Sequence, residues 1–288
     1  MEDQAEKLRE QLQQLQTNSQ SKTVAVISGK GGVGKSNISL NLAITLKNKG
    51  HRVLLFDLDI GMGNIDILMG VSSFYSIADF FTNNVPLNQM ITEVPGGIHY
   101  ISGGTGLSQL TNITKNSFHT FFEQFSILLY EYDYVIFDMD AGMSERSLRF
   151  ILAVDEVIVV TTCEPTSITD AYAAMKYITI ANHTMPFLII VNRAQSEKEG
   201  IDTFNRISRV LQHFLQKKAI LLGILPEDSS IPQAVKRQTP FTQFNEKAPA
   251  SKALFSMVEK YCLQDFYPPA NYNKTNFVTR LRRFLLGR

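Results

Sequence analysis

The sequence predicts an α/β fold with a mostly parallel central sheet and helices on both of its faces. Short apolar runs of strand length recur between residues 22 and 265, and helical stretches separate most of them. Strands that are apolar at every position are typical of a parallel sheet that is covered on both sides. Seven runs fit this description: TVAVIS, RVLLFDLD, GIHYIS, YDYVIFDMD, DEVIVVTT, PFLIIVNR and KAILLGIL.

Composition narrows the class of protein. The 288 residues are 44% hydrophobic and 19% charged, which excludes wholesale disorder, and the net charge of +1 does not favour a surface that coats nucleic acid. Two distant cysteines, Cys163 and Cys262, make a disulfide scaffold or a cysteine-held metal site within one chain improbable. The polar N-terminus does not resemble a signal peptide, and no apolar run has the length of a spanning helix. We therefore expect a cytoplasmic protein.

The chain divides into three units. Residues 1–20 are rich in glutamine, and their few apolar residues (Ala5, Leu8, Leu12 and Leu15) recur at helical spacing. This pattern predicts a short N-terminal helix that packs against a partner or on itself, because a short lone helix is marginal in water; a frayed tail is the alternative. Residues 22–265 form the α/β domain. Residues 266–288 form a connector rich in proline and asparagine, followed by a last helix.

The strongest motif lies between the first predicted strand and the first predicted helix. Residues 29–36 read GKGGVGKS and fit the P-loop pattern G-x-x-x-x-G-K-[ST] in its strand–loop–helix context. Glycines let the backbone N–H groups turn inward around phosphate oxygens, and the helix N-terminus adds its positive dipole end. Lys35 is expected to reach the β and γ phosphates of ATP, and Ser36 to place its hydroxyl on Mg²⁺.

Acidic residues follow two of the apolar strands. Asp138 ends one strand in the position of a Walker B carboxylate, and Asp59 ends another just before a glycine-containing loop. With Ser36, these carboxylates are the candidate Mg²⁺ site, and Asp59 could orient an attacking water. A strand-end aspartate can instead cap a helix or form a turn.

Several segments together resemble the MinD/ParA family of deviant Walker A ATPases. Residues 29–36 contain the early lysine of that family, Lys30. Residues 56–61 and 64–66 are similar to its switch I, and residues 138–142 stand at the position of switch II. The resemblance spans residues 22–260. It implies a slow ATPase that dimerises with ATP and Mg²⁺, in which Lys30 of each subunit crosses to the partner's phosphates. Lys30, Lys35, Asp59 and Asp138 are then the catalytic residues. The implied nucleotide-binding residues are Gly29, Lys30, Gly31, Gly32, Val33, Gly34, Lys35, Ser36 and Asn37, with Asn192, Arg193, Pro226, Glu227 and Asp228 near the adenine.

One residue departs from the family pattern. Switch II of MinD-like proteins reads D-x-P-A-G or D-x-G-A-G, whereas residues 138–142 here read DMDAG, with Asp140 in the middle. A second carboxylate near the γ-phosphate would repel it unless the side chain is turned away or paired. We therefore expect Asp140 to affect hydrolysis more than nucleotide binding.

Within the family, the N-terminus resembles that of the FlhG (YlxH or FleN) group, which regulates the number and placement of flagella. Residues 3–9 match the D-Q-A-x-x-L-R element of that group. The resemblance implies that residues 1–20 stimulate an FlhF-like GTPase of the SRP type, with Gln4 and Arg9 at its nucleotide site and Leu8 as an apolar anchor. It also implies that flagellar C-ring proteins similar to FliM and FliY are partners.

The last helix has an apolar side flanked by arginines and no acidic residue. Its apolar residues are Phe277, Val278, Leu281, Phe284 and Leu285, and its basic residues include Arg280, Arg282 and Arg283. This pattern is typical of an interfacial helix that binds anionic lipid, reversibly as one copy and more tightly as two. The family resemblance agrees and implies reversible association with the inner face of the cell membrane. The alternative is a last helix that packs on its own domain.

Four other functions remain open. A MinD septum-site ATPase would begin closer to the P-loop strand. A ParA-type DNA-partition ATPase would need a basic dimer face. A reductase-like relative would need two suitably placed cysteines for an iron–sulfur cluster, and a nucleotide-insensitive scaffold would not need Lys35, Ser36, Asp59 and Asp138. No specific nucleic-acid binding is expected.

Overall fold

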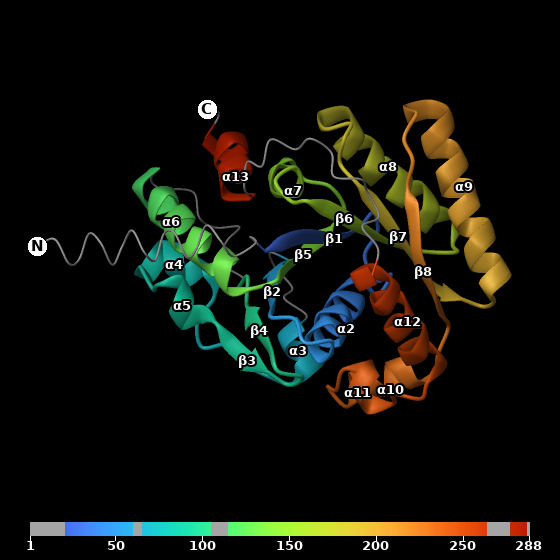
Figure 1. Ribbon diagram of the computed structural model, residues 1–288, viewed down its shortest axis with the longest axis horizontal. Coiled ribbons are helices and arrows are strands. Elements are labelled where there is room, and N and C mark those ends of the chain that lie inside the picture. Colours follow the sequence, from blue (N-terminus) through green and yellow to red (C-terminus); the bar gives the residue numbers. More distant parts are fainter. Residues whose placement is uncertain (1–20, 60–64, 105–114, 264–276, 287–288) are drawn as a thin grey trace, which may run out of the picture.

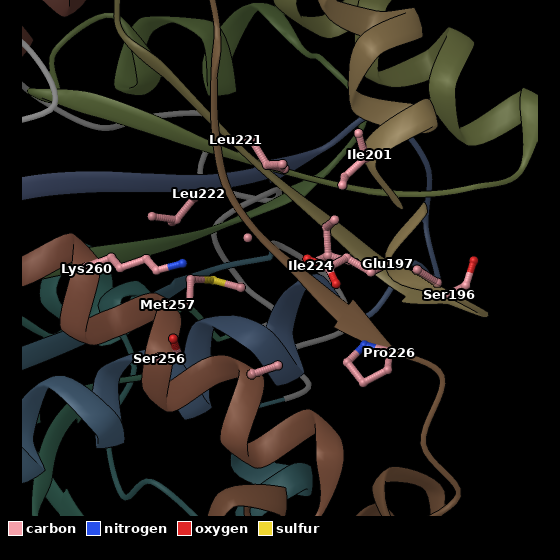
Figure 2. Close-up of a pocket in the computed structure, with 13 residues that line it drawn as sticks. Ser196, Glu197, Ile201, Leu221, Leu222, Ile224, Pro226, Ser256, Met257 and Lys260 are labelled. Carbon is pink, nitrogen blue, oxygen red and sulfur yellow. The ribbon is translucent and has the colours of Figure 1, made fainter. Parts of the chain in front are cut away.

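The computed structural model describes residues 21–59, 65–104, 115–263 and 277–286 (Figure 1). The predicted N-terminal helix, with Gln4, Leu8 and Arg9, lies outside these residues. Among the described helices, none is long and apolar enough to cross a bilayer.

The described strands form one eight-stranded sheet in the order β3-β4-β2-β5-β1-β6-β7-β8. Every neighbouring pair is parallel except β3 with β4. The strands are β1 (Lys22–Ser28), β2 (Val53–Leu58), β3 (Thr92–Val94), β4 (Ile98–Ile101), β5 (Tyr134–Ala141), β6 (Glu156–Thr162), β7 (Phe187–Ala194) and β8 (Ile220–Pro226). The predicted parallel sheet is confirmed. The sequence did not reveal β3, because three residues at a sheet edge are too few to show a pattern.

Helices cover both faces of this sheet (Figure 1). One face carries α2 (Lys35–Asn48), α3 (Ile65–Met69), α10 (Ser230–Lys236), α11 (Phe241–Phe244) and α12 (Pro249–Leu263). The other carries α4 (Ile77–Asn83), α5 (Leu87–Met90), α6 (Lys115–Glu131), α7 (Glu145–Ile151), α8 (Pro165–Ala181), α9 (Glu197–Leu215) and α13 (Phe277–Leu286).

The strands divide the core into two apolar clusters. In β1, Val24 and Val26 pack under α2 and α12, whereas Ala25 and Ile27 face the opposite layer. Successive side chains of a strand point to opposite faces, so an apolar residue at every position lets one strand serve both layers. This is the physical reason for the continuous apolar runs in the sequence.

The C-terminal helix lies elsewhere than the sequence predicted. α13 packs against α6 and α7, and Phe277, Val278 and Leu281 are 2%, 7% and 0% exposed. The ring of Phe277 stacks on that of Phe137 with centroids 5.1 Å apart. In this conformation the face assigned to lipid instead covers the domain's own core, as in the alternative reading of the sequence. Phe284 packs at the edge of the same cluster, and the side chain of Leu285 lies outside the described residues.

A buried charge network joins the edge of the sheet where β1 and β6 begin to α12. Glu156, at the start of β6, is 4% exposed; its Oε2 lies 3.1 Å from Lys22 Nζ, and its Oε1 accepts a hydrogen bond from the Tyr261 hydroxyl. Burial raises the pKa of Glu156, and the charge of Lys22 opposes that rise. This carboxylate therefore depends on two partners that are far from it in the sequence.

We expect Glu156→Ala to lower the free energy of unfolding by about 2 kcal/mol, because it removes a buried carboxylate that accepts from the Tyr261 hydroxyl and balances the Lys22 ammonium. Urea unfolding followed by circular dichroism measures the change. The control is Glu145→Ala, which removes an exposed ion pair with Arg149 and should cost less than about 1 kcal/mol. Equal effects of the two substitutions would contradict the structural role of Glu156.

Candidate nucleotide site

The P-loop lies where β1 meets α2, at the carboxyl edge of the sheet. Gly32 and Gly34 have φ angles of 79° and 92°, in the left-handed region that favours glycine. Gly29 is required for a different reason: a Cβ there would lie 2.1 Å from the backbone carbonyl carbon of Asp170 in α8. Close contact with α8 therefore fixes the start of the loop, and backbone conformation fixes its end.

Lys35 and Asp138 form a buried ion pair in the centre of the site. Lys35 Nζ lies 2.8 Å from Asp138 Oδ1, and the two side chains are 7% and 1% exposed. The same carboxylate oxygen accepts a hydrogen bond of 2.7 Å from Ser39, one helical turn after Lys35, and Lys35 also donates to Ser36. The structure thus brings together three predicted residues, and it adds Ser39, whose i+4 spacing from Lys35 could have revealed it.

The other Asp138 oxygen provides a test for Mg²⁺. Asp138 Oδ2 is buried and has no hydrogen-bond partner among the described residues. A buried carboxylate oxygen without a partner is costly, and it is the kind of acceptor that a water bound to Mg²⁺ would satisfy. With the Ser36 hydroxyl nearby on the other side of Lys35, the residues present fit the predicted Mg²⁺ site.

Asp57 is a site residue that the sequence analysis did not select. It is the register partner of Asp138 across β2 and β5 and is fully buried. Burial, and after it the charge of Asp138, raises the pKa of Asp57 to about 7. The carboxylate accepts hydrogen bonds from the backbone N–H of Asp59 and from the Tyr100 hydroxyl. A pKa near neutrality means that Asp57 exchanges a proton close to pH 7.

Asp59 lies at the end of β2 and is half-buried. Burial raises the pKa of its carboxyl, Lys35 opposes this effect, and the carboxylates of Asp138 and Asp140 reinforce it. The charges of the Lys35–Asp138 pair therefore act on Asp59, and its roles in metal binding and water positioning stay predictions. The glycine-containing loop at residues 60–64 lies outside the described residues.

Lys30 points away from this centre. Its Nζ lies 3.1 Å from Glu164 Oε2 and 3.2 Å from Thr166 Oγ1, at the N-terminal end of α8. Both partners of the ion pair are well exposed, at 43% for Lys30 and 62% for Glu164. The early lysine is therefore held by its own chain at the rim of the site, by a glutamate that no local pattern in the sequence identifies.

The predicted adenine-contacting residues gather at the ends of β7 and β8, but each has a structural contact. Asn192 donates a 2.8 Å hydrogen bond to Val33 O in the P-loop, and its Oδ1 is buried without a partner among the described residues. Pro226 pairs with Ala194, and the following Glu227 N–H donates to Ala194 O. Asp228 accepts from the backbone N–H groups of Ser230 and Ala250.

Two further predicted residues have local roles. Arg193 is exposed and adopts a left-handed φ of 56°. Asn37 accepts a hydrogen bond from Asn41, which in turn accepts from Thr242. Adenine contact by Asn192, Arg193 and residues 226–228 stays a prediction, as does nucleotide binding by Asn37.

Asp140 is turned away from the P-loop. Its Oδ1 accepts a 2.7 Å hydrogen bond from the Ser147 hydroxyl in α7. The structure therefore resolves the departure noted in the sequence: the additional carboxylate is paired, with a residue seven positions later.

Comparison with known proteins identifies a family of P-loop NTPases. The ParA family model, described as a NUBPL iron-transfer P-loop NTPase, matches residues 19–262. The chain is 32% identical to the antiactivator FleN of Pseudomonas aeruginosa, over 86% of this chain and 88% of that protein. It is 36% identical to the flagellum site-determining protein YlxH of Helicobacter pylori, over 75% and 74%.

Solved structures share the fold. MinD from Aquifex aeolicus superposes with a TM-score of 0.69 at 23% identity, covering 87% of this chain and all of that one. MinD from Pyrococcus horikoshii, solved with Mg-ADP, gives a TM-score of 0.68 at 22% identity, covering 84% and 96%. Because the family model spans the whole α/β domain and both flagellar relatives exceed 30% identity, the chain belongs to the FlhG/FleN group of the MinD/ParA family of P-loop ATPases.

Proposed function

We propose that this protein is an ATP-dependent switch that regulates the number and placement of flagella. An ATP-bound homodimer acts at the membrane, and an ADP-bound or empty monomer returns to the cytoplasm. The observation that carries the proposal is the Lys35–Asp138–Asp59 centre with a second lysine, Lys30, at its rim. The names of the relatives FleN and YlxH support the flagellar role over septum placement.

The residues of the site imply how the phosphates are received. Lys35 exchanges its bond with Asp138 for phosphate oxygens, which leaves the Asp138 carboxylate free to hold a Mg²⁺-bound water. Ser36, Asp138 and Asp59 would hold Mg²⁺, which would supply positive charge to the transferring phosphoryl group. Asp59, at the end of β2, orients the attacking water. The proton on Asp57 limits the negative charge that Asp138 faces inside the sheet.

Lys30 supplies the link between two subunits. In the single chain it pairs with Glu164 and Thr166. An exposed ion pair contributes no more than about 1 kcal/mol, so it yields easily to a phosphate oxygen across a dimer interface. Lys30 then provides positive charge in trans, as an arginine finger does.

The docked position of α13 makes membrane binding conditional. Its apolar residues are buried against α6 and α7, while Arg282 and Arg283 face solvent. Lipid binding therefore requires the helix to leave the domain, which favours release by ATP over avidity alone as the mechanism. Once released, two helices in a dimer bind anionic lipid more tightly than one.

The remaining partners follow from the family resemblance. Residues 1–20 stimulate an FlhF-like GTPase through Gln4, Leu8 and Arg9, and the ATPase domain binds C-ring proteins similar to FliM and FliY. Because β1 begins at Lys22, the N-terminal segment can act on a partner without disturbing the nucleotide site.

The nucleotide switch is tested by Lys30→Ala and Asp59→Ala. Lys30→Ala should bind ATP, but it should dimerise poorly and hydrolyse little ATP. Asp59→Ala should still dimerise, but it too should hydrolyse little ATP. Size-exclusion chromatography with light scattering in ATP measures the difference. Lys49→Ala is the matched control, because Lys49 is also 43% exposed and also pairs with an exposed glutamate, Glu259. Normal dimerisation of Lys30→Ala would refute the role in trans.

Membrane binding is tested by liposome flotation in ATP and ADP with anionic and neutral lipid. Phe284→Glu should abolish binding, because it places a charge on the apolar face of α13. Arg282→Ala should weaken binding several-fold at low salt, whereas the control Lys252→Ala, on the exposed side of α12, should not. Equal recovery on the two lipids, or no effect of Phe284→Glu, would show that α13 is only a structural helix.

The activator role is tested with a synthetic peptide of residues 1–20 added to an FlhF-like GTPase. The peptide should raise GTP turnover, and a peptide with Gln4→Ala and Arg9→Ala should not. Deletion of residues 1–20 should leave ATP binding intact and abolish stimulation. Unchanged GTP turnover with the wild-type peptide would rule out this function for the segment.

A further inference from the structure

Switch II and α13 are attached to opposite ends of the same short helix. α7 spans seven residues, Glu145–Ile151, or about 10 Å along its axis. Its N-terminal turn bonds to Asp140 of switch II. The segment that follows its C-terminal end bonds to Arg280 of α13. Figure 1 shows α7 and α13 next to each other, and the two helices are in contact.

The bonds at the first end form a directed chain of hydroxyls. Ser147 donates to Asp140 Oδ1 at 2.7 Å and therefore accepts from the Ser144 hydroxyl, 2.5 Å away. Ser144 in turn caps the helix by accepting from the backbone N–H of Ser147 at 3.1 Å. A carboxylate bound to a buried hydroxyl (Ser147 is 6% exposed) is a strong tether, because one partner is ionised.

The second end holds α13 through one arginine. Arg280 donates from Nε to Ala153 O at 2.6 Å and from its terminal nitrogen to Asp155 Oδ1 at 2.5 Å. Asp155 is itself fixed by the backbone and hydroxyl of Thr23 at the start of β1. The docked helix is thus attached to the turn between α7 and β6 as well as to the apolar core.

Asp140 is placed to respond to the nucleotide. It follows Asp138 by two residues, at a shift in register between β1 and β5, and its side chain turns to α7 whereas that of Asp138 turns to α2. The next residues touch the P-loop: the Gly142 N–H donates to Ser28 O, and Ala141 lies against Gly31. Negative charge that arrives in the P-loop repels a carboxylate fixed this close to it, and Gly142, at a φ of 86°, allows the turn to move.

We propose that Asp140 is a positioning residue that couples the nucleotide site to α13. When the phosphates displace Asp140, it shifts α7 through Ser147. This shift weakens the contacts that hold Arg280 and Phe277 of α13 on the domain. The inference rests on the proposed function, since it names the internal connection through which ATP releases the membrane helix. It also gives a role to the one residue that departs from the family's switch II pattern.

Hydrogen–deuterium exchange of residues 277–286 in ADP and in ATP tests the coupling in the full chain. In the wild type, exchange should be faster in ATP. Ser147→Ala should reduce this ATP-dependent acceleration about tenfold, the worth of one hydrogen bond to a charged group. ATP-dependent dimerisation should stay as in the wild type, which a merely destabilised protein would not show. Asp140→Asn keeps an acceptor for Ser147 but loses the charge, and it should reduce the acceleration likewise.

Two further variants complete the experiment. Ser126→Ala removes a hydroxyl that bonds to Phe122 O in α6, the other helix that packs on α13, and it should keep the full ATP response. Arg280→Gln should release α13 equally in both nucleotides. Three results would each overturn the inference. They are an unchanged ATP response in Ser147→Ala, release of α13 by Ser147→Ala in both nucleotides, and a wild-type α13 that does not respond to ATP. Failure of the wild type to dimerise in ATP would instead count against the proposed function, which keeps the two failures distinct.

Discussion

The ion pair between Lys35 and Asp138 joins the two central strands of the sheet through the first residue of α2. It exists because β1 and β5 are neighbours, so the P-loop that follows one strand faces the carboxylate near the end of the other. The pair is almost fully buried, and such a pair is stable only when each charge keeps its partner. A nucleotide that takes Lys35 must therefore bring a replacement cation for Asp138, and we propose that Mg²⁺ takes that place. ATP and Mg²⁺ are for this reason expected to bind together.

The same constraint organises the surrounding carboxylates. Asp57, Asp59, Asp138 and Asp140 meet within two adjacent strand ends, and four full negative charges there would repel one another and the phosphates. The structure separates them by environment. Burial and the charge of Asp138 raise the pKa of Asp57 to about 7, Lys35 balances Asp138, and Ser147 binds Asp140. Asp59 is half-buried at the end of β2, and in the proposed function it acts on the substrate.

Both elements that must move in the proposed cycle are held by exchangeable contacts. Lys30 rests on Glu164 and Thr166 at the exposed end of α8, and α13 rests on α6 and α7. The two contacts differ in strength, because the first is a solvated ion pair and the second buries three apolar side chains. Exchange of Lys30 requires only an attractive phosphate, whereas release of α13 requires a force transmitted through the fold. The connection through α7 provides a path for that force.

The sequence by itself determined the sheet, the P-loop and the acidic strand ends, since each follows from local patterns: continuous apolar runs, glycine spacing and the position of a carboxylate after a strand. It could not determine which side chains from distant segments meet. Asp57 is apparent only when β2 and β5 are paired in register, and Glu164 only when α8 is placed beside the P-loop. For α13, an amphipathic pattern shows that one face must be buried but not against what, because lipid and a protein core satisfy the same apolar residues. Only the tertiary structure decided that in this conformation the domain itself covers the helix, because it brings α6 and α7 against the apolar residues of α13.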